Sequence, residues 1–541
     1  MHHAVALAAP SSKRNLTTIA RTSAPTPGEV SLIAASALLT ILSFPDFDLW
    51  FLAWIGLVPL LVVTVQALNA RQAFLLGWLW GVIFFYGSCW WLTYPVIHYG
   101  HISAWLAYPL LLLPVALGAL FPALFCVLLH RLVSRFGLGA IFIAPFAWVS
   151  IELARYAVTG QLWNAMGYSQ AFQPLLIQTA RWGGVYAVSF LIIAVNGAIG
   201  FAFLRREATA TATILVVLGA LLAIGVAALR QNAVVDLHAG STASQIVAVQ
   251  PNVPMEGTDD RANEQLLNRH IELSKQGLSS LPNDPRFSRL VIWPESPMNF
   301  SYSRDPHLKE IAGSFAKAYH ASILMNSLEP AANNGDYNSA VMVNEEGGIV
   351  AQYDKIRLMP FGEYVPLPRW LPGASSVRGI VGDFTPGSSY TLMPLGAIRA
   401  GVFICIEAAH PSIARAFAKR GAGVLINISN DGYLGPTPVM RQHLSNAIFR
   451  AVENDRPLVR VTNSGITAFI EPDGHVRDIT GGFQPAVRSW SVGQSREGQT
   501  FYTRYGDVFV YAGALITLGF VSATFMTRRK KLEKTMVKRR G

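Results

Sequence analysis

The 541-residue sequence contains only three cysteines, Cys89, Cys126 and Cys405. The first two fall within apolar stretches, and Cys405 is the single thiol of the more polar part of the chain. This part therefore cannot form an internal disulfide. An unpaired thiol is a liability in an oxidising compartment unless it is buried or has a use, so Cys405 is a candidate for chemistry.

Charged residues are scarce as well, at 14% of the chain, whereas 52% of the residues are hydrophobic. A soluble domain has about 25% charged residues. The apolar excess lies before Arg230 and after Gly506, and the region between them has an ordinary soluble composition. The composition therefore predicts membrane-embedded segments on both sides of one soluble domain.

The net charge is +11, and much of the surplus lies in residues 528–540, directly after an apolar stretch. A basic cluster beside a membrane span is a topology signal and a contact for anionic lipid. The sequence has no zinc-finger spacing, RNA-recognition signature or basic zipper, which argues against a nucleic-acid partner. His98 and His101 have no third ligand at a zinc spacing, and we expect neither a metal nor a cofactor.

The apolar stretches predict a bundle of membrane-spanning helices. A span needs about 20 mainly apolar residues. The first apolar stretch lacks a small-residue cleavage site, so we expect it to be retained as an anchor. Eight spans are predicted, at Val30–Phe47, Leu49–Leu68, Ala73–Val96, Ser103–Leu132, Leu138–Ala157, Tyr186–Leu204, Thr211–Leu229 and Val508–Met526.

Basic residues before span one and after spans two, four, six and eight predict that both termini are cytoplasmic. Arg155 and Arg181 fall on the opposite side and are exceptions to this pattern. The predicted organisation is a disordered cytoplasmic N-terminus (1–28), transmembrane helices 1–7 (29–230), an extracytoplasmic catalytic domain (231–505), transmembrane helix 8 (506–527) and a basic cytoplasmic tail (528–541).

The soluble block alternates β-branched runs with helical segments, which predicts a layered α/β domain. Helices are predicted at 260–276, 411–419 and 438–453, and strands at 246–249, 290–293, 322–325, 340–343, 349–353, 398–406, 423–428, 458–461 and 466–470.

Reactive side chains stand where predicted strands end. Glu295 follows an apolar strand, Lys355 is followed eight positions later by Glu363, and Cys405 and Glu407 end another strand. A carboxylate can take the proton of a thiol, and an ammonium can stabilise the oxyanion that develops in acyl transfer. Each residue alone is more often structural, because a lone cysteine usually packs in a core and a lone lysine is usually solvated.

The segments Trp293-Pro-Glu295-Ser, Lys355 through Pro-Phe-Gly-Glu363-Tyr-Val-Pro, and Cys405-Ile-Glu407 together resemble the nitrilase superfamily. With eight spans around the domain, the chain is similar to the apolipoprotein N-acyltransferases of bacterial inner membranes over about residues 30–526. Segments at 163–170 and 429–435, and Gln442-His443, match as well. The resemblance implies an α-helical transmembrane bundle joined to an α/β nitrilase-like αββα sandwich.

The resemblance also implies the roles of the site residues. Cys405 is expected to accept an acyl chain as a thioester, Glu295 to act as general base and later as acid, and Lys355 to stabilise the oxyanion. Glu363 and Glu407 are expected to support them, and a purely structural role is the alternative for both. The chain departs from the family at Ile406, where Tyr is common, and at Tyr433-Leu434, where Trp-Phe is common. Asp383, Asn427 and Asn430 are interpreted as ordinary polar residues.

The implied activity is the transfer of an acyl chain from a phospholipid, expected to be phosphatidylethanolamine, to the α-amine of a diacylglyceryl-cysteine at a lipoprotein N-terminus. The enzyme is expected to be a monomer of the bacterial inner membrane with its catalytic domain on the periplasmic side. One alternative is a membrane-tethered nitrilase-like amidase that passes the acyl group to water. The other is an inactive scaffold that only binds lipoproteins.

Overall fold

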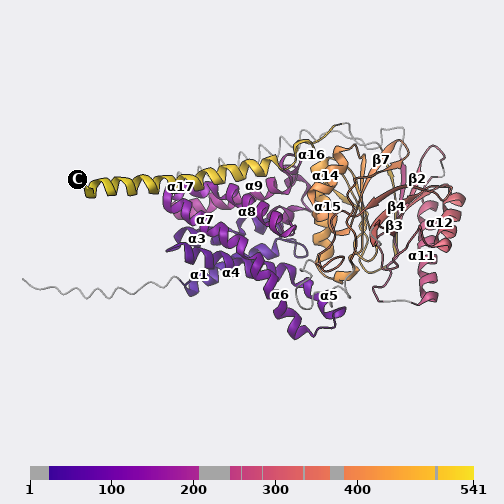
Figure 1. Ribbon diagram of the computed structural model, residues 1–541, viewed down its shortest axis with the longest axis horizontal. Coiled ribbons are helices and arrows are strands. Elements are labelled where there is room, and N and C mark those ends of the chain that lie inside the picture. Colours follow the sequence, from indigo (N-terminus) through magenta and orange to yellow (C-terminus); the bar gives the residue numbers. More distant parts are fainter. Residues whose placement is uncertain are drawn as a thin grey trace, which may run out of the picture.

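The computed structural model describes residues 24–205, 244–256, 259–282, 284–332, 335–365, 383–493 and 498–540. It consists of a bundle of apolar helices, here called the frame (residues 27–205 and 508–540), and an α/β domain stacked on one end of it (Figure 1). The predicted seventh span, Thr211–Leu229, lies outside the described residues.

The regular elements of the frame are all helices in its described part. Local signals set some helix ends: Thr26 and Glu29 form a capping box at the start of the first helix, and Gly160 ends α8 in a left-handed conformation. The elements are α1 (Pro27–Leu42), η1 (Trp50–Leu52), α2 (Ala53–Gly56), α3 (Val58–Gln66), α4 (Ala70–Cys89), η2 (Trp90–Leu92), α5 (Thr93–His98), α6 (Ala104–Gly118), α7 (Leu120–Phe136), η3 (Leu138–Ile143), α8 (Ala144–Thr159), η4 (Met166–Gln170), η5 (Pro174–Leu176), α9 (Ala180–Arg205) and α17 (Val508–Arg540).

Within the described residues, five helical segments are long and apolar enough to cross a membrane: Ala70–His98, Ala104–Phe136, Leu138–Thr159, Ala180–Arg205 and Val508–Met526. They correspond to five of the eight predicted spans. The first two predicted spans correspond to shorter apolar helices, Pro27–Leu42 and Trp50–Gln66. The long fourth span divides into α6 and α7 between Gly118 and Leu120.

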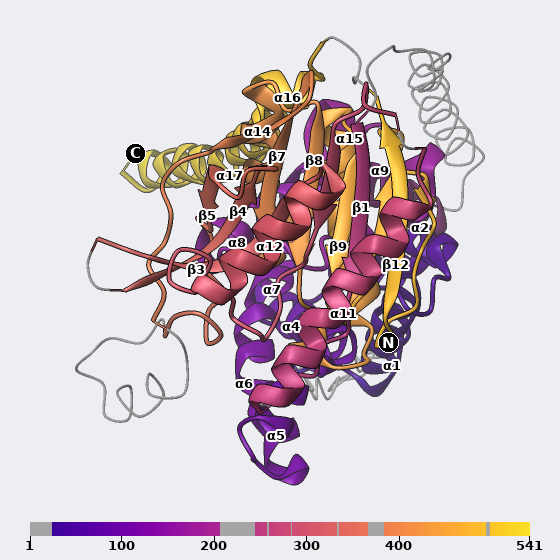
Figure 2. The same ribbon diagram turned by 90° about the vertical axis from the view of Figure 1, so that its right-hand side faces the viewer.

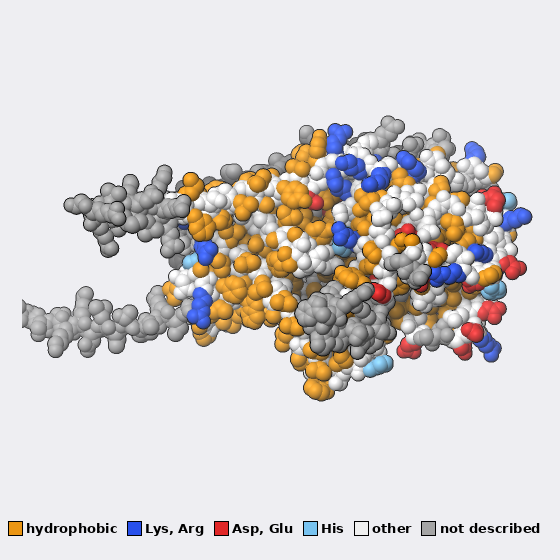
Figure 3. All heavy atoms as spheres, in the orientation of Figure 1, with side chains coloured by type: hydrophobic (Ala, Val, Ile, Leu, Met, Phe, Trp, Pro, Cys, Tyr) orange, Lys and Arg blue, Asp and Glu red, His pale blue; other side chains and the backbone are white. Residues whose placement is uncertain are grey.

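Close helix packing holds the frame together. A Cβ at Gly81 of α4 would collide with Pro122 and Ala119 of the α6–α7 segment, so glycine lets the two helices approach closely. The outward side chains of α6, including Leu113 and Leu117, remain exposed. Hydrophobic side chains dominate the visible surface of the frame, while charged ones gather over the α/β domain (Figure 3). This surface is the kind that lipid would cover.

In its described residues, the α/β domain contains two six-stranded sheets. Burial on both faces suits the apolar runs of the parallel strands at the centre of each sheet. The strand order of the first is β12-β1-β2-β3-β4-β5, with bounds Ala486–Val492, Ser244–Gln250, Arg289–Ile292, Ser322–Pro330, Asp336–Val343 and Ile349–Asp354. The strand order of the second is β11-β10-β9-β8-β7-β6, with bounds Val476–Arg477, Ala468–Ile470, Leu458–Thr462, Val424–Ser429, Ile398–Ile404 and Leu392–Leu395.

The two sheets pack face to face, with contacts between β1 and β9 and between β4 and β7. Helices α11 (Asp260–Ser279) and α12 (Pro306–Tyr319) cover the outer face of the first sheet (Figure 2). Helices α14 (Pro411–Lys419) and α15 (Val439–Asn454) cover the second, and short α16 (Phe501–Tyr505) leads to α17. This arrangement confirms the predicted αββα sandwich.

The α14–α15 layer lies between the sheets and the frame (Figure 1). Gln442 of α15 joins the two parts: the indole N–H groups of Trp163 and Trp91 donate to its side-chain oxygen at 2.8 and 3.1 Å. Arg181, an exception in the charge pattern, forms an ion pair with Asp455 at 2.9 Å just after α15. The frame and the domain therefore meet through polar contacts as well as apolar packing.

Candidate active site

Cys405 stands at the sharp turn between β7 and the short helix η6 (Cys405–Ala409). Its φ angle is 51°, in the left-handed region that a side chain other than glycine rarely adopts. Such strain persists only where the surrounding structure holds it, and it is common at functional sites. The strained backbone therefore indicates that neighbouring residues hold the conformation of Cys405 and so set the direction of its side chain.

Lys355 directly follows β5 and is almost completely buried, with 1% of its side chain exposed. Its ammonium donates to Glu363 Oε1 at 2.8 Å and lies 3.4 Å from Glu295 Oε1. A buried ammonium needs such partners, because an unpaired charge in the interior costs several kcal/mol. The structure thus brings together Glu295, Lys355 and Glu363, three of the residues that the sequence singled out.

Glu295 lies just beyond β2 and is held from two sides. The Asn338 amide donates to Glu295 Oε1 at 2.9 Å and to Glu363 Oε1 at 2.6 Å, and the Asn430 backbone N–H donates to Glu295 Oε2 at 3.1 Å. Asn338 comes from β4 and Asn430 follows β8, so both sheets contribute. These contacts fix the orientation of both carboxylates.

Burial raises the pKa of the Cys405 thiol well above its ordinary value; the charge of Glu295 adds to this effect and Lys355 opposes it. Burial lowers the pKa of the Lys355 ammonium, but the charges of Glu295 and Glu363 outweigh burial and keep that pKa above its ordinary value. The resting site therefore combines a neutral thiol with a charged ammonium. A neutral thiol has to lose its proton to a base before it can act as a nucleophile.

Glu407 is fully buried and does not face open space. Its carboxylate accepts hydrogen bonds from the Tyr353 hydroxyl at 2.8 Å and from the backbone N–H groups of Ile356, Arg357 and Ile404 at 2.8, 3.0 and 2.8 Å. It therefore ties the loop that carries Lys355 to the strand that carries Cys405. These contacts give Glu407 a structural position, and its supporting role in the chemistry stays a prediction.

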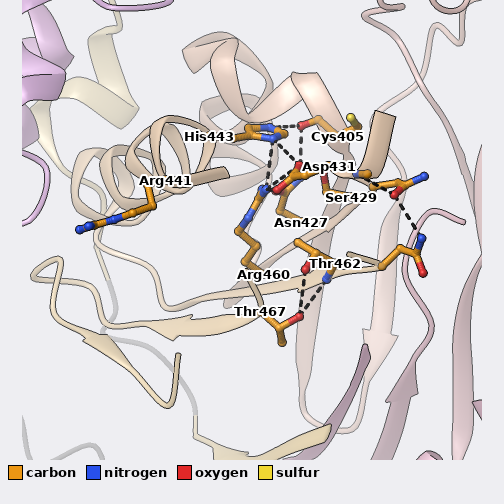
Figure 4. Close-up of polar contacts among 12 residues, drawn as sticks. Cys405, Asn427, Ser429, Asp431, Arg441, His443, Arg460, Thr462 and Thr467 are labelled. Atoms are coloured by element: carbon orange, nitrogen blue, oxygen red, sulfur yellow. Dashed lines mark hydrogen bonds and ion pairs between the residues drawn. The ribbon is translucent and has the colours of Figure 1, made fainter. Parts of the chain in front are cut away.

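Sequence reasoning missed a buried cluster behind the Cys405 turn, formed by Asp431, His443 and Arg460 with Asn427 (Figure 4). Arg460 donates to Asp431 Oδ2 at 2.8 Å and also to Asn427. Burial raises the pKa of Asp431, but the charges of Arg460 and His443 dominate and leave it below its ordinary value. The sequence contained two separate hints of this cluster, the segments Ser429-Asn-Asp431 and Gln442-His443. Their side chains meet only in the fold.

In the described residues, Glu471, Asp473 and His475 form a group with potential metal-ligand atoms within 4.8 Å of one another. Arg477 already pairs with Glu471, and His475 lies 2.9 Å from Asp473. The group is distant in sequence and fold from the Cys405 turn, at the hairpin of β10 and β11. We assign it no part in the chemistry.

Two family models match the chain. The apolipoprotein N-acyltransferase N-terminal domain matches residues 36–198, and the carbon-nitrogen hydrolase domain matches residues 249–484. The first match coincides with most of the frame before residue 206. The second contains the region around Glu295, Lys355 and Cys405.

Relatives resemble the chain over most of its length. It is 34% identical to the apolipoprotein N-acyltransferase of Geobacter metallireducens, with 92% of this chain and 95% of that protein aligned. It is 32% identical to the enzyme of the same name from Allorhizobium ampelinum, over 75% of this chain and 77% of that protein. Among solved structures, a mutant amidase from Nesterenkonia sp. AN1 aligns with 51% of this chain and 97% of its own, at 16% identity and a TM-score of 0.38.

Proposed function

The chain belongs to the apolipoprotein N-acyltransferase family, and on this premise we propose that Cys405 carries the acyl chain from donor to acceptor. The donor is a membrane phospholipid, and the acceptor is the N-terminal amine of a diacylglyceryl-cysteine on an apolipoprotein. The observation that supports this assignment best is the buried Lys355 ammonium, which lies 2.8 Å from Glu363 and 3.4 Å from Glu295, together with the strained backbone of Cys405 at the end of β7.

In the first half-reaction, Glu295 accepts the thiol proton as the Cys405 sulfur attacks the ester carbonyl carbon of the phospholipid. The Lys355 ammonium stabilises the oxyanion of the tetrahedral intermediate. The bond between that carbon and the glycerol oxygen then breaks, and Glu295 returns the proton to this oxygen. A lysophospholipid leaves and a thioester remains on Cys405.

In the second half-reaction, the lipoprotein amine attacks the thioester carbonyl. A carbon–nitrogen bond forms and the carbon–sulfur bond breaks. Glu295 accepts a proton from the amine and passes it to the departing sulfur, which restores the neutral thiol. The product is an amide, and the resting site is regenerated without a cofactor.

The frame would hold the catalytic domain at the membrane surface, where both lipid substrates lie. Withdrawing an acyl chain from lipid costs about 0.8 kcal/mol for each CH₂ group. A catalytic domain seated on apolar helices lets both substrates keep their chains in the bilayer while their head groups reach the thiol. The chain is a membrane protein; its basic loops support a bacterial inner-membrane location with the domain on the periplasmic side, and we propose phosphatidylethanolamine as donor and a monomer as the active form.

The test is incubation of the purified full-length protein with phosphatidylethanolamine vesicles, with and without a diacylated lipopeptide, followed by mass spectrometry of the products. We expect N-acylated lipopeptide and lysophospholipid in equal amounts, and neither with Cys405→Ala. Release of free fatty acid without acylated lipopeptide would instead identify a hydrolase. Unchanged acylation by Cys405→Ala would exclude the proposed nucleophile.

A further inference from the structure

The backbone carbonyl of Cys405 is held by side chains that the proposed reaction does not use. His443 Nε2 lies 3.0 Å from this oxygen, and Asn427 Nδ2 lies 3.5 Å from it. Because a carbonyl oxygen only accepts, Nε2 must carry a hydrogen. This carbonyl belongs to the strained residue of the turn, so the bond bears directly on the conformation of Cys405.

His443 is itself held on its other side. Its Nδ1 lies 2.9 Å from Asp431 Oδ1 and 3.1 Å from Arg460 Nη2. The side chains of Arg460, Asp431 and His443 are 0%, 2% and 4% exposed, so water does not compete for these bonds. Arg460 comes from β9 and His443 from α15, and Asp431 lies in the short connection between β8 and the helix η7 (Gly432–Leu434).

The cluster does not act on the sulfur itself. In Figure 4 the Cys405 carbonyl is directed toward His443, whereas the sulfur lies on the other side of the residue. From this geometry we infer that Asp431, His443 and Arg460 are positioning residues, which fix the Cys405 peptide plane and thereby the direction of its thiol. The inference deepens the proposed function and rests on its assignment of Cys405 as the nucleophile.

The same helix turn also connects the thiol to the frame. Gln442, the residue before His443, donates to the Ser88 carbonyl at 3.1 Å and accepts from Trp163 and Trp91. The Trp163 ring in turn packs against the His443 ring, with 5.6 Å between centroids. Consecutive residues of α15 therefore fix the nucleophile turn relative to the frame helices.

The test measures thiol reactivity separately from acyl transfer. Full-length protein in detergent is treated with iodoacetamide, and the alkylation rate of Cys405 is followed on its own peptide, apart from Cys89 and Cys126. The acylation rate of a diacylated lipopeptide and the apparent Tm are measured on the same samples. The variants are His443→Ala and His443→Gln, because the glutamine amide N–H can replace the Nε2 donor.

Arg441→Gln is the matched control. Arg441 lies on the same helix turn, points away from the cluster in Figure 4 and pairs with Asp48 at 2.6 Å on a partly exposed surface. It reports the effect of changing this turn without touching the bond to Cys405. We expect both rates to stay near those of the unmodified protein.

We expect His443→Ala to slow alkylation of Cys405 and acyl transfer by about 10- to 100-fold, since a displaced reacting group costs this much. His443→Gln should recover most of both rates, which a merely structural role would not require. Rates for folded His443→Ala within about threefold of the unmodified protein would overturn the inference. So would a His443→Gln protein that has normal Tm but reacts as slowly as His443→Ala.

If His443→Ala does not fold, Asp431→Asn replaces it with the same expectation, because it keeps the side-chain volume and removes the charge that orients His443. Failure of the proposed function looks different. In that case the unmodified protein gives no acylated lipopeptide, while the alkylation rates of the variants still decide whether the cluster positions the thiol.

Discussion

Replacing Lys355 by methionine should affect activity and stability to different extents, and the two can be separated. The Lys355 ammonium lies 2.8 Å from Glu363 and 3.4 Å from Glu295. Methionine fills a similar volume but leaves both carboxylates without their cation. It also removes the group that we expect to stabilise the oxyanion.

The structure sets the size of both effects. Loss of one partner from a buried ion pair costs about 3–5 kcal/mol. The side chains of Glu295 and Glu363 are 15% and 11% exposed to solvent. This partial solvation places the expected loss of stability near the lower figure, about 3 kcal/mol. In a domain of this size, that corresponds to a Tm decrease of roughly 6–12 °C. Loss of oxyanion stabilisation should lower kcat by about 10²- to 10³-fold.

The assays are lipopeptide acylation and the apparent Tm from tryptophan fluorescence, with the exposed Lys317→Met as control. Adding Glu363→Gln to Lys355→Met removes one uncompensated carboxylate and should recover about 1 kcal/mol or more of stability. It should not recover turnover, because the ammonium is still missing. Turnover of Lys355→Met within about tenfold of the unmodified protein would refute the assigned role.

Three further changes test other parts of the structure. Burial lowers the pKa of His270 to about 4 from its ordinary 6.5. As the pH falls, the unfolded chain takes up a proton at this residue before the folded chain does, so the free energy of unfolding should decrease by about 3 kcal/mol between pH 6.5 and pH 4. His270→Asn should flatten the dependence of Tm on pH over this interval. Glu407→Gln turns an amide N–H toward backbone donors and should cost about 1–3 kcal/mol together with slower acylation, whereas acylation at the normal rate would show that the carboxylate does not hold the site. Gln442→Leu leaves the Trp163 indole N–H without its acceptor, while Trp91 keeps its bond to the Ser88 carbonyl at 3.0 Å. The change should lower the free energy of unfolding by about 1–3 kcal/mol, and an unchanged Tm would mean that this junction does not fasten the domain to the frame.

Much of the α/β domain could be predicted because its strands are short β-branched runs with clear ends. The strands predicted at 290–293, 398–406 and 423–428 correspond to β2, β7 and β8. Strand β12 (Ala486–Val492) was missed, because Arg488 and the alternating serines hide its pattern, and it pairs with β1 over a long sequence separation. Helix α12 (Pro306–Tyr319) was missed too, although Asp305 caps it and Pro306 begins it.

The sequence predicted only those residues of the candidate site that lie in short, recognisable segments. Glu295, Lys355 and Cys405 could be singled out because reactive side chains follow apolar strands. Asn338 could not, since it is an ordinary polar residue within β4 and only the fold places its amide between two carboxylates. Asn430 was given no role because its contribution comes from the backbone N–H, which carries no side-chain signal.

The frame shows a different limit of sequence reasoning. Hydropathy found the long apolar helices, but it did not give the point at which Ser103–Leu132 divides into α6 and α7. It also gave Arg181 no partner, whereas the fold supplies Asp455 from the other domain. Contacts between distant segments depend on how the elements pack, and no local pattern records them.

The central claim is that an acyl chain from lipid is attached covalently to Cys405. The most direct measurement is the intact mass of the full-length protein after incubation with phospholipid in the absence of an acceptor. We predict an added mass of one acyl chain that maps to the Cys405 peptide, is lost on treatment with hydroxylamine or a diacylated lipopeptide, and is absent from Cys405→Ser. An unmodified mass for a protein that still acylates lipopeptide, or an adduct that persists in Cys405→Ser, would contradict it.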